Sequence, residues 1–291
     1  MKKHFSLSII LILICSILLT SCNYIINDGK KTNALPKDNK ELRVHFIDVG
    51  QGDAMLIQLN GYTLLIDAGP EASYPKLKSY LDKNGIFNFD YVITTHPHED
   101  HIGGMPELLK QYSIKNVYGS KVINNTDNFK CMVEELKNKK LKIQVLRAGS
   151  NLKLGDDAIL KILSPTEESY KDINNYSVVV KLEYKKVSFL FMGDAETEVE
   201  SKLLLNKTDV TADVLKIGHH GSNSSTSEEF LKAVSPKYAV ISCGKNNDYG
   251  HPHKETIEKL KQSNIKYFRT DENGNILITS DGETIKTDQE R

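Results

Sequence analysis

Five side chains that can bind a metal ion fall within six residues, in the segment His96-Pro97-His98-Glu99-Asp100-His101. The segment follows the apolar run 91–95 and precedes Ile102 and two glycines, so we expect it at the end of a buried strand. Neutral imidazoles and carboxylates are ligands that Zn²⁺ and similar divalent ions prefer. Burying such groups beside an apolar strand is costly unless a cation compensates them. The segment therefore predicts a metal site; a solvated loop is the weaker alternative, because a loop needs no histidine at this density.

Three further segments place residues of the same chemical kind after apolar runs. These residues are Asp67, Asp194 and the adjacent pair His219 and His220. Strand ends in layered α/β proteins are where binding sites form. An aspartate there can bridge two metal ions, although a simple turn role for Asp67 and a helix-capping role for Asp194 stay open. Adjacent imidazoles point in different directions, so we expect only one histidine of the pair to bind metal.

Apolar runs and helical spacings from Glu41 onward predict one domain of residues 41–291. We expect strands at residues 42–47, 54–59, 62–66, 91–95, 142–146, 158–163, 177–182, 187–192, 212–217, 275–279 and 284–286. We expect helices at residues 74–84, 106–112, 128–139, 195–205, 226–234 and 254–262, with Thr226 and Glu229 spaced as a capping box. Some strands follow one another directly and others are separated by helices. This order predicts an α+β fold of two mixed sheets packed face to face, with helices on the outer faces.

The amino-terminal segment is typical of a lipoprotein signal peptide spanning residues 1–22. A short basic start and about 15 apolar residues precede Leu19-Thr20-Ser21-Cys22, which is similar to a bacterial lipobox with Cys22 as the lipidation site. The apolar stretch is short for a membrane-spanning helix, which needs about 20 residues; an uncleaved anchor helix is the alternative. Residues 23–40 are polar and predict a flexible tether. We therefore expect an extracytoplasmic domain that is lipid-anchored to the cell membrane.

Composition limits the other functions. With 38 basic and 38 acidic residues, the chain has no overall field for capturing a polyanion, so any nucleic-acid contact must come from a local patch. The lysines between 137 and 142 lack the interleaved aromatic residues typical of a platform for single strands. Cys131 and Cys243 could form one disulfide, but the absence of a Cys-x-x-Cys spacing argues against thiolate metal ligands.

The pattern His-x-His-x-Asp-His after an apolar strand resembles the signature of the metallo-β-lactamase superfamily, whose fold is an αββα sandwich. The resemblance implies one or two divalent ions, Zn²⁺ or Mn²⁺. It implies that Asp67 supports the metal-binding loop and that His219 lines the site. The metal ligands that it implies are His96, His98, Asp100, His101, Asp194 and, as the favoured member of the pair, His220.

The superfamily pattern is broken at one position. The resemblance implies a further histidine ligand before Asp194, but no histidine occurs from residue 102 to 193, and Asn174-Asn175-Tyr176-Ser177 stands in its place. One metal position would keep His96 and His98 and lose its third imidazole. Water, an Asn or Ser oxygen, or nothing would fill that position. Hydrolysis of β-lactams is therefore not expected.

Several segments together resemble the hydrolase domain of ComEC-type competence proteins over about residues 41–287. In that family the domain is thought to be a nuclease acting during DNA uptake. The resemblance implies DNA as the substrate and competence channel proteins as partners. No multi-span membrane region accompanies the domain here, which predicts the hydrolase module alone on its tether. The segments are Asp48-Val49-Gly50-Gln51-Gly52-Asp53-Ala54, 174–177, Gly193-Asp194-Ala195-Glu196, His219-His220-Gly221-Ser222, Ser242-Cys243-Gly244, Asn246, Tyr249, His251-Pro252-His253 and Arg269-Thr270-Asp271 with Gly274.

The activity expected from these observations is metal-dependent hydrolysis of a DNA phosphodiester outside the cytoplasm. Asp100 or Asp194 would orient the attacking water. Lys245 would pair with a phosphate, and His253 would donate a proton to the leaving group. A second interpretation is hydrolysis of another ester, such as a cell-wall phosphodiester or a lactone. A third is a non-catalytic module that binds DNA or the cell envelope around a structural ion.

Overall fold

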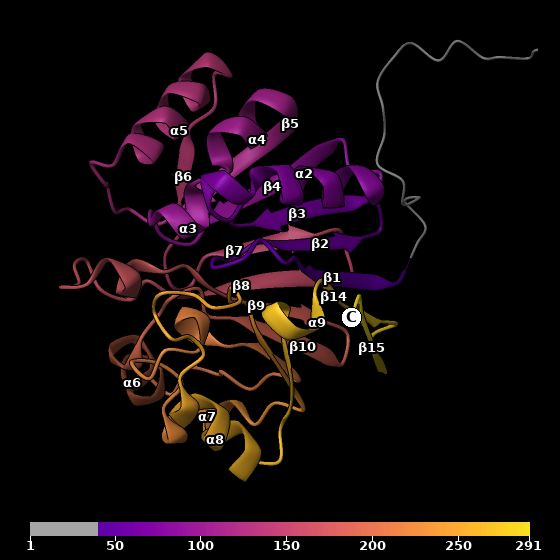
Figure 1. Ribbon diagram of the computed structural model, residues 1–291, viewed down its shortest axis with the longest axis vertical. Helices are drawn as coiled ribbons and strands as arrows, with labels where there is room; N and C mark the ends of the chain where they lie inside the picture. Colours follow the sequence, from indigo (N-terminus) through magenta and orange to yellow (C-terminus); the bar gives the residue numbers. More distant parts are fainter. Residues whose placement is uncertain (1–39) are drawn as a thin grey trace, which may run out of the picture. The chain divides into compact units, whose positions relative to one another are not determined.

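Two mixed β-sheets face each other, and helices cover their outer faces (Figure 1). The computed structural model describes residues 40–291. The first sheet has the strand order β15-β14-β1-β2-β3-β4-β5-β6, and the second has the order β13-β12-β11-β10-β9-β8-β7. The arrangement confirms the α+β sandwich that the sequence predicts.

The strands of the first sheet are β1 Leu42–Phe46, β2 Met55–Leu59, β3 Tyr62–Ile66, β4 Asn88–Thr94, β5 Ser113–Gly119, β6 Ile143–Val145, β14 Ile276–Ser280 and β15 Ile285–Gln289. Those of the second sheet are β7 Asn151–Leu154, β8 Ala158–Ser164, β9 Val179–Tyr184, β10 Val187–Phe191, β11 Val214–Lys216, β12 Tyr238–Ile241 and β13 Lys266–Arg269. The α-helices are α2 Tyr74–Lys83, α3 Glu99–Ile102, α4 Met105–Gln111, α5 Asp127–Asn138, α6 Thr197–Leu205, α7 Glu228–Val234, α8 Lys254–Gln262 and α9 Thr270–Asn273. Short 3₁₀ helices are η1 Glu71–Ser73, η2 Ile173–Tyr176 and η3 Gly218–Gly221.

Each sheet changes from antiparallel to parallel pairing near its middle. In the first sheet, β15 to β3 are antiparallel, whereas β3, β4, β5 and β6 run parallel. In the second sheet, β7 to β10 are antiparallel and β10 to β13 run parallel. The carboxyl ends of parallel strands lie at one edge of a sheet, where α/β proteins form their sites.

The alternation of side chains along the strands divides the core into three layers. Met55, Ile57 and Leu59 of β2 belong to the layer between the two sheets, whereas Leu56 faces the helices of the first sheet. Figure 1 places α2, α4 and α5 over that outer face and α6, α7 and α8 over the outer face of the second sheet. Because both faces of β2 are covered, all five of its residues are buried and only Gln58 is polar.

Some expectations about the elements need correction. The sequence patterns did not predict β5, β7, β12 and β13; the last three are four residues each, and β7 is a sheet edge. The capping box is wrong: Ser227 is the N-cap of α7 and accepts from Phe230 N, because the buried Glu200 carboxylate holds the amides of Thr226 and Ser227.

The structure also bears on the cysteines and the amino-terminal segment. Cys131 is exposed, Cys243 is buried and both are free, so they do not form the disulfide that the sequence left open. The signal peptide, Cys22 and residues 23–39 of the tether lie outside the described residues. Within residues 40–291, no helix has the length and apolar character needed to cross a bilayer.

The buried His45 generates a prediction about acid stability. Its ring contacts the Tyr80 hydroxyl at 2.8 Å and Gln58 Oε1 at 3.1 Å. Burial, together with the positive charge of Arg43, lowers the pKa of His45 to about 3 from 6.5. Below pH 6.5 His45 is protonated in the unfolded chain but stays neutral in the folded chain. The contribution of neutral, buried His45 to stability is therefore fully present above that pH and is lost as the pH falls.

Urea unfolding at pH 7 and pH 5 tests this expectation. When the pH is lowered from 7 to 5, protonation of His45 in the unfolded chain should reduce the free energy of unfolding by about 2 kcal/mol, since one pKa unit corresponds to about 1.4 kcal/mol. The variant His45→Gln keeps a polar side chain without a titrating ring, so its loss should be smaller by that amount. Equal pH dependence in the two proteins would refute the assignment.

Candidate metal centre

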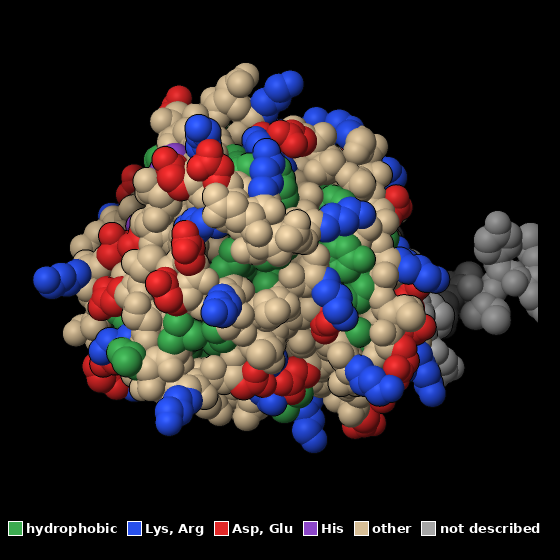
Figure 2. Space-filling view, turned by 90° about the horizontal axis from the view of Figure 1, so that it is seen from below, with side chains coloured by type: hydrophobic (Ala, Val, Ile, Leu, Met, Phe, Trp, Pro, Cys, Tyr) green, Lys and Arg blue, Asp and Glu red, His purple; other side chains and the backbone are tan. Residues whose placement is uncertain are grey.

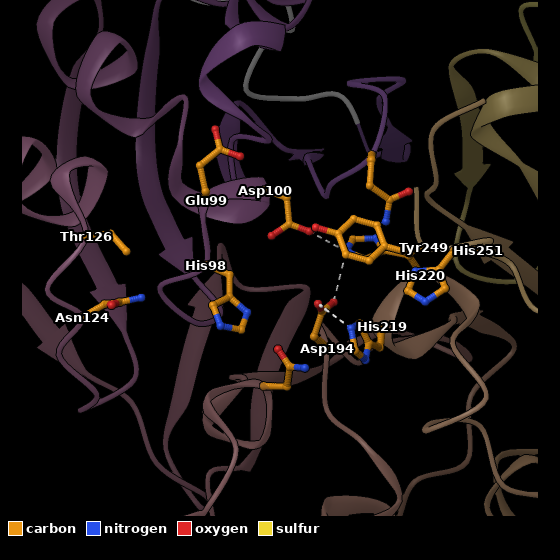
Figure 3. A pocket seen from close by; sticks show the side chains of 12 residues that line it. His98, Glu99, Asp100, Asn124, Thr126, Asp194, His219, His220, Tyr249 and His251 are labelled. Atoms are coloured by element: carbon orange, nitrogen blue, oxygen red, sulfur yellow. Dashed lines mark hydrogen bonds and ion pairs between the residues drawn. The ribbon is translucent and has the colours of Figure 1, made fainter. Parts of the chain in front are cut away.

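The ends of four strands bring the predicted ligands together at one edge of the sandwich. Asp67 follows β3 and the segment 96–101 follows β4, both in the first sheet. Asp194 follows β10 and the pair His219-His220 follows β11, both in the second sheet. Figure 3 shows Asp100, Asp194, His219 and His220 converging. The site therefore lies across the junction of the two sheets and needs both of them.

Four of these side chains form a group suited to a divalent ion. One ligand atom from each of Asp100, His101, Asp194 and His220 lies within 4.8 Å of the others. His220 Nε2 is 3.1 Å from Asp100 Oδ2 and 3.4 Å from Asp194 Oδ1. His101 Nε2 is 3.3 Å from Asp194 Oδ2. Two imidazoles and two carboxylates are a donor set that Zn²⁺ and Mn²⁺ both accept.

The unsatisfied atoms of this group support a cation at its centre. His101 Nε2 and Asp194 Oδ1 are buried and form no hydrogen bond within the described residues. Buried polar atoms without partners are uncommon and call for a ligand or an ion. Both atoms belong to the group of four, so the residues present fit a bound metal.

The charges of the group favour the same conclusion. Burial opposes a proton on His220, but the carboxylates of Asp194 and Asp100 outweigh burial and raise the pKa of His220 to about 10. Burial likewise opposes a charge on His101, yet Asp194, Asp100 and Asp67 raise its pKa well above the usual value. The buried carboxylates of the group are thus stabilised by positive charge close to them, which protons on the histidines or a metal ion can supply.

His96 and His98 form a second group, with fewer potential ligands, beside the first. His96 Nε2 is 3.0 Å from His98 Nδ1 and 3.8 Å from Asp194 Oδ2. The 3₁₀ helix η2 lies where the resemblance implies a third histidine. Ser177 contacts His96 Nδ1 through its hydroxyl and accepts a hydrogen bond from Asp194 N, whereas Asn174 lines the pocket with a buried Oδ1 that has no partner within the described residues.

Asp67 fixes the orientation of His101 from behind. The Asp67 carboxylate is 2.8 Å from His101 Nδ1, and it accepts hydrogen bonds from Thr95 N at 2.8 Å and Thr95 Oγ1 at 2.7 Å. With Nδ1 donating to this carboxylate, Nε2 is left to face Asp194. A carboxylate behind a metal-binding histidine fixes the ring and raises its basicity. The supporting role expected of Asp67 therefore has a geometric basis.

Backbone geometry distinguishes the two adjacent histidines. His219 and His220 both have positive φ, at 46° and 52°, which is rare outside glycine. His220 turns inward and its Nδ1 donates to Ser242 O at 2.9 Å, leaving Nε2 for the group of four. His219 Nδ1 contacts Glu196 and Ser224, each at 3.1 Å, so this ring lies at the side of the site. Strained backbone of this kind is common at functional sites.

A buried ion pair lies directly behind His220. Lys216 Nζ is 2.9 Å from Asp53 Oδ2, and neither side chain is exposed to solvent. Asp53 Oδ1 is also 3.5 Å from His220 Nδ1. Asp53 precedes β2 of the first sheet and Lys216 ends β11 of the second, so the pair joins the two sheets beneath the metal centre. Asp53 lies in the segment 48–54 that carries the resemblance, although the resemblance gives it no role, and nothing in the local sequence marks Lys216 as part of the site.

An open pocket of about 520 Å³ covers the metal centre. Most of its other walls lie in segments that carry the metal-binding motif or the sequence resemblance, whereas Asn124 and Thr126 come from a loop without such a pattern. Its lining residues are Gln51, His98, Glu99, Asp100, Asn124, Thr126, Asn174, Asp194, His219, His220, Tyr249 and His251.

The structure does not bring His253 or Lys245 into this pocket. His253 Nδ1 accepts from Asn223 N and its Nε2 contacts Tyr249 O, so both ring nitrogens are engaged with backbone. His251 lines the pocket instead and is only 9% exposed. Lys245 is exposed in an adjoining hollow that shares His251 with the pocket. The spacing His-x-His could have drawn attention to His251, but only the fold distinguishes it from His253.

Substituting Asp67 tests the metal centre. Asp67→Asn replaces an acceptor of three hydrogen bonds by an amide, which frees the His101 ring to turn. We expect metal affinity to fall about 10- to 100-fold, the usual effect of losing such a support. The measurement is metal content by elemental analysis at fixed free Zn²⁺ or Mn²⁺.

Asp90→Asn is the matched control. Asp90 is also buried, accepts from Thr63 N at 2.9 Å and pairs with Lys115 at 2.6 Å, but it lies on β4 away from the carboxyl end that carries the site. Its affinity for metal should equal that of the unaltered chain. Equal losses in both variants would mean that Asp67 acts on the fold and not on the metal.

Comparisons with known proteins agree with this geometry. The model of the metallo-beta-lactamase superfamily matches residues 47–245. ComE operon protein 3 of Bacillus subtilis (strain 168) is 34% identical over 256 residues, covering 82% of this chain and 33% of that protein. Recombination protein 2 of Haemophilus influenzae is 30% identical over 254 residues, covering 86% of this chain and 30% of that protein. The chain therefore spans about a third of the length of these curated relatives.

The solved structures agree at the level of the fold. The metallo-beta-lactamase fold protein YhfI from Bacillus subtilis superposes with a TM-score of 0.54 at 12% identity, covering 85% of this chain and all of that one. The named competence relatives confirm the resemblance to the hydrolase domain of ComEC-type proteins. With the family model matching more than half of the chain, and its signature residues gathered at one site, this protein belongs to the metallo-beta-lactamase superfamily.

Proposed function

We propose that this protein is a metal-dependent phosphodiesterase that cleaves DNA outside the cytoplasm. The observation that carries the proposal is the group Asp100, His101, Asp194 and His220 at the floor of an open pocket. Relatives named for competence and recombination support DNA as the substrate class. Other esters, such as a cell-wall phosphodiester, remain the alternative that substrate assays would reveal.

The residues of the pocket have distinct roles in such a reaction. A divalent ion held by the group of four would lower the pKa of water from about 15.7 to near 7 and stabilise charge on phosphoryl oxygens. Asp100, 28% exposed, faces the pocket and is placed to accept a proton from the attacking water. Asp194 is 2% exposed and holds its position through Ser177. Glu196 and Ser224 hold His219 at the side of the pocket, where it can contact a phosphate oxygen.

Recognition of a polyanion would depend on local contacts rather than on a broad field. Figure 2 shows the face on the side of α7 and α8, where basic and acidic side chains are interspersed. Near the pocket, Arg269 pairs with Asp271, and Arg291 pairs with Asp48. Lys245 is exposed in the same hollow. We propose that Lys245 contacts a phosphate next to the one that is cleaved, as its sequence position suggests.

A nuclease assay tests the proposed function. The purified chain should release fragments from labelled single- or double-stranded DNA when Mn²⁺ or Zn²⁺ is supplied. Asp100→Ala should reduce this rate by about 10²- to 10⁴-fold, because it removes both a proton acceptor and a metal ligand. Asp156→Ala, which removes an exposed carboxylate from a turn, is the control and should retain full activity.

The alternatives give different results in the same assay. DNA binding without cleavage under either metal would support the non-catalytic module. Cleavage of lactones or cell-wall phosphodiesters, but not of DNA, would move the proposal to another ester. Residual nuclease activity equal in Asp100→Ala and the unaltered chain would indicate a contaminant.

We further propose that Cys22 carries a lipid that holds the domain at the membrane, where channel proteins of DNA uptake would be its partners. The basis is the sequence of residues 1–22. Cys22→Ala should abolish incorporation of a labelled fatty acid, because the thiol is the acceptor. An unaltered chain that is never labelled but stays with the membrane fraction would instead indicate an uncleaved anchor helix.

A further inference from the structure

Tyr249 is an aromatic side chain held in solvent at the rim of the metal pocket. Its side chain is 67% exposed, although it lines the same pocket as Asp100, Asp194 and His220. Figure 3 shows its ring beside the converging carboxylates and imidazoles. The ring is therefore open to contact with a ligand that enters the pocket.

The Tyr249 ring stacks on His251, and no other ring contact of Tyr249 is found within residues 40–291. Its centroid is 5.6 Å from that of His251, with an angle of 23° between the planes. His251 is in turn almost buried and packs edge-on against His253, with centroids 4.9 Å apart. The histidines thus form a firm backing for one face of the ring and leave its exposed surface for another planar group.

The backbone around Tyr249 is also fixed. Asn247 Oδ1 accepts from Tyr249 N at 3.1 Å and from His251 N at 3.0 Å, and its amide donates to Gly244 O at 2.9 Å. The Tyr249 carbonyl contacts His253 Nε2 at 3.2 Å. A ring presented by such a preorganised loop loses little conformational freedom when a ligand stacks on it.

The opposite side of the pocket carries complementary groups. Asn124 and Thr126 line it there (Figure 3), and the neighbouring Ile123 is 76% exposed. The Asn124 amide donates to Pro97 O at 3.0 Å, which ties this loop to the metal-binding segment. A ligand between the two sides would meet an aromatic face on one and amide and hydroxyl groups on the other. A nucleobase has this chemistry, with an apolar face and polar edges.

We propose that Tyr249 is a stacking platform for one unpaired nucleobase of the substrate, next to the phosphate at the metal centre. The proposal rests on the DNA phosphodiesterase function and specifies its substrate as single-stranded. In a duplex, each base is stacked between its neighbours and cannot lie on the tyrosine without being unstacked. Stacking on an aromatic side chain tolerates every base, so the platform selects strandedness and not sequence.

Equilibrium binding tests the platform separately from cleavage. The probes are a fluorescent twelve-residue oligothymidylate and an oligomer of equal length in which every nucleotide is abasic, both measured with the full chain in a metal chelator. The unaltered chain should bind the oligothymidylate about 5- to 150-fold more tightly than the abasic oligomer, the range for one stacked base. Tyr249→Ala and Tyr249→Leu should lose this preference, whereas Tyr249→Phe, which keeps the ring, should retain it.

The outcomes separate this proposal from the proposed function. An unaltered preference in Tyr249→Ala, or no preference in the unaltered chain, overturns the platform even if DNA is cleaved. A preference that depends on the aromatic ring, in a chain that cleaves neither oligomer with Mn²⁺ or Zn²⁺, supports the platform and refutes the phosphodiesterase. Loss of preference in Tyr249→Phe as well would mean that the hydroxyl acts and that stacking does not.

Discussion

Charge buried where the two sheets meet is the constraint on which this structure depends. Lys216 and Asp53 come from different sheets and pair with no exposure to solvent. Asp53 is 3.5 Å from His220, which is in turn 3.4 Å from Asp194. Charges removed from water are costly unless each one has a partner at close range. Each sheet supplies charged partners for groups on the other sheet, so the site forms only where the two sheets are packed together.

The division between rigid and adaptable parts follows from this constraint. Residues that surround the metal position directly follow strand ends, and their rings and carboxylates are held by Asp67, Thr95, Ser177 and Ser242. The remaining walls of the pocket come from loops, among them those of Asn124 and Tyr249. A site built this way fixes the chemistry while its loops are free to define the substrate.

Because the third histidine of the superfamily pattern is missing, the two groups of potential metal ligands in the site differ in composition. In the group of Asp100, His101, Asp194 and His220 every member except Asp100 is buried, whereas the group with His96 and His98 has Asn174 and Ser177 nearby. The two groups each contain two imidazoles and differ in their carboxylates, because the first includes Asp100 and Asp194, whereas in the second His96 is 3.8 Å from Asp194.

The sequence by itself determined the two-sheet sandwich, most strand and helix positions, and the concentration of ligands at 96–101. These features depend on local periodicity and on the cost of burying polar groups, both of which neighbouring residues express. Only the tertiary structure decided that His220 faces the metal position while His219 lies beside it, because a backbone turn with positive φ sets the two directions. It also decided that His251 lines the pocket and His253 does not, and that Lys216 meets Asp53. Such contacts follow from strand register and from the packing of separate layers, which no local pattern of residues encodes.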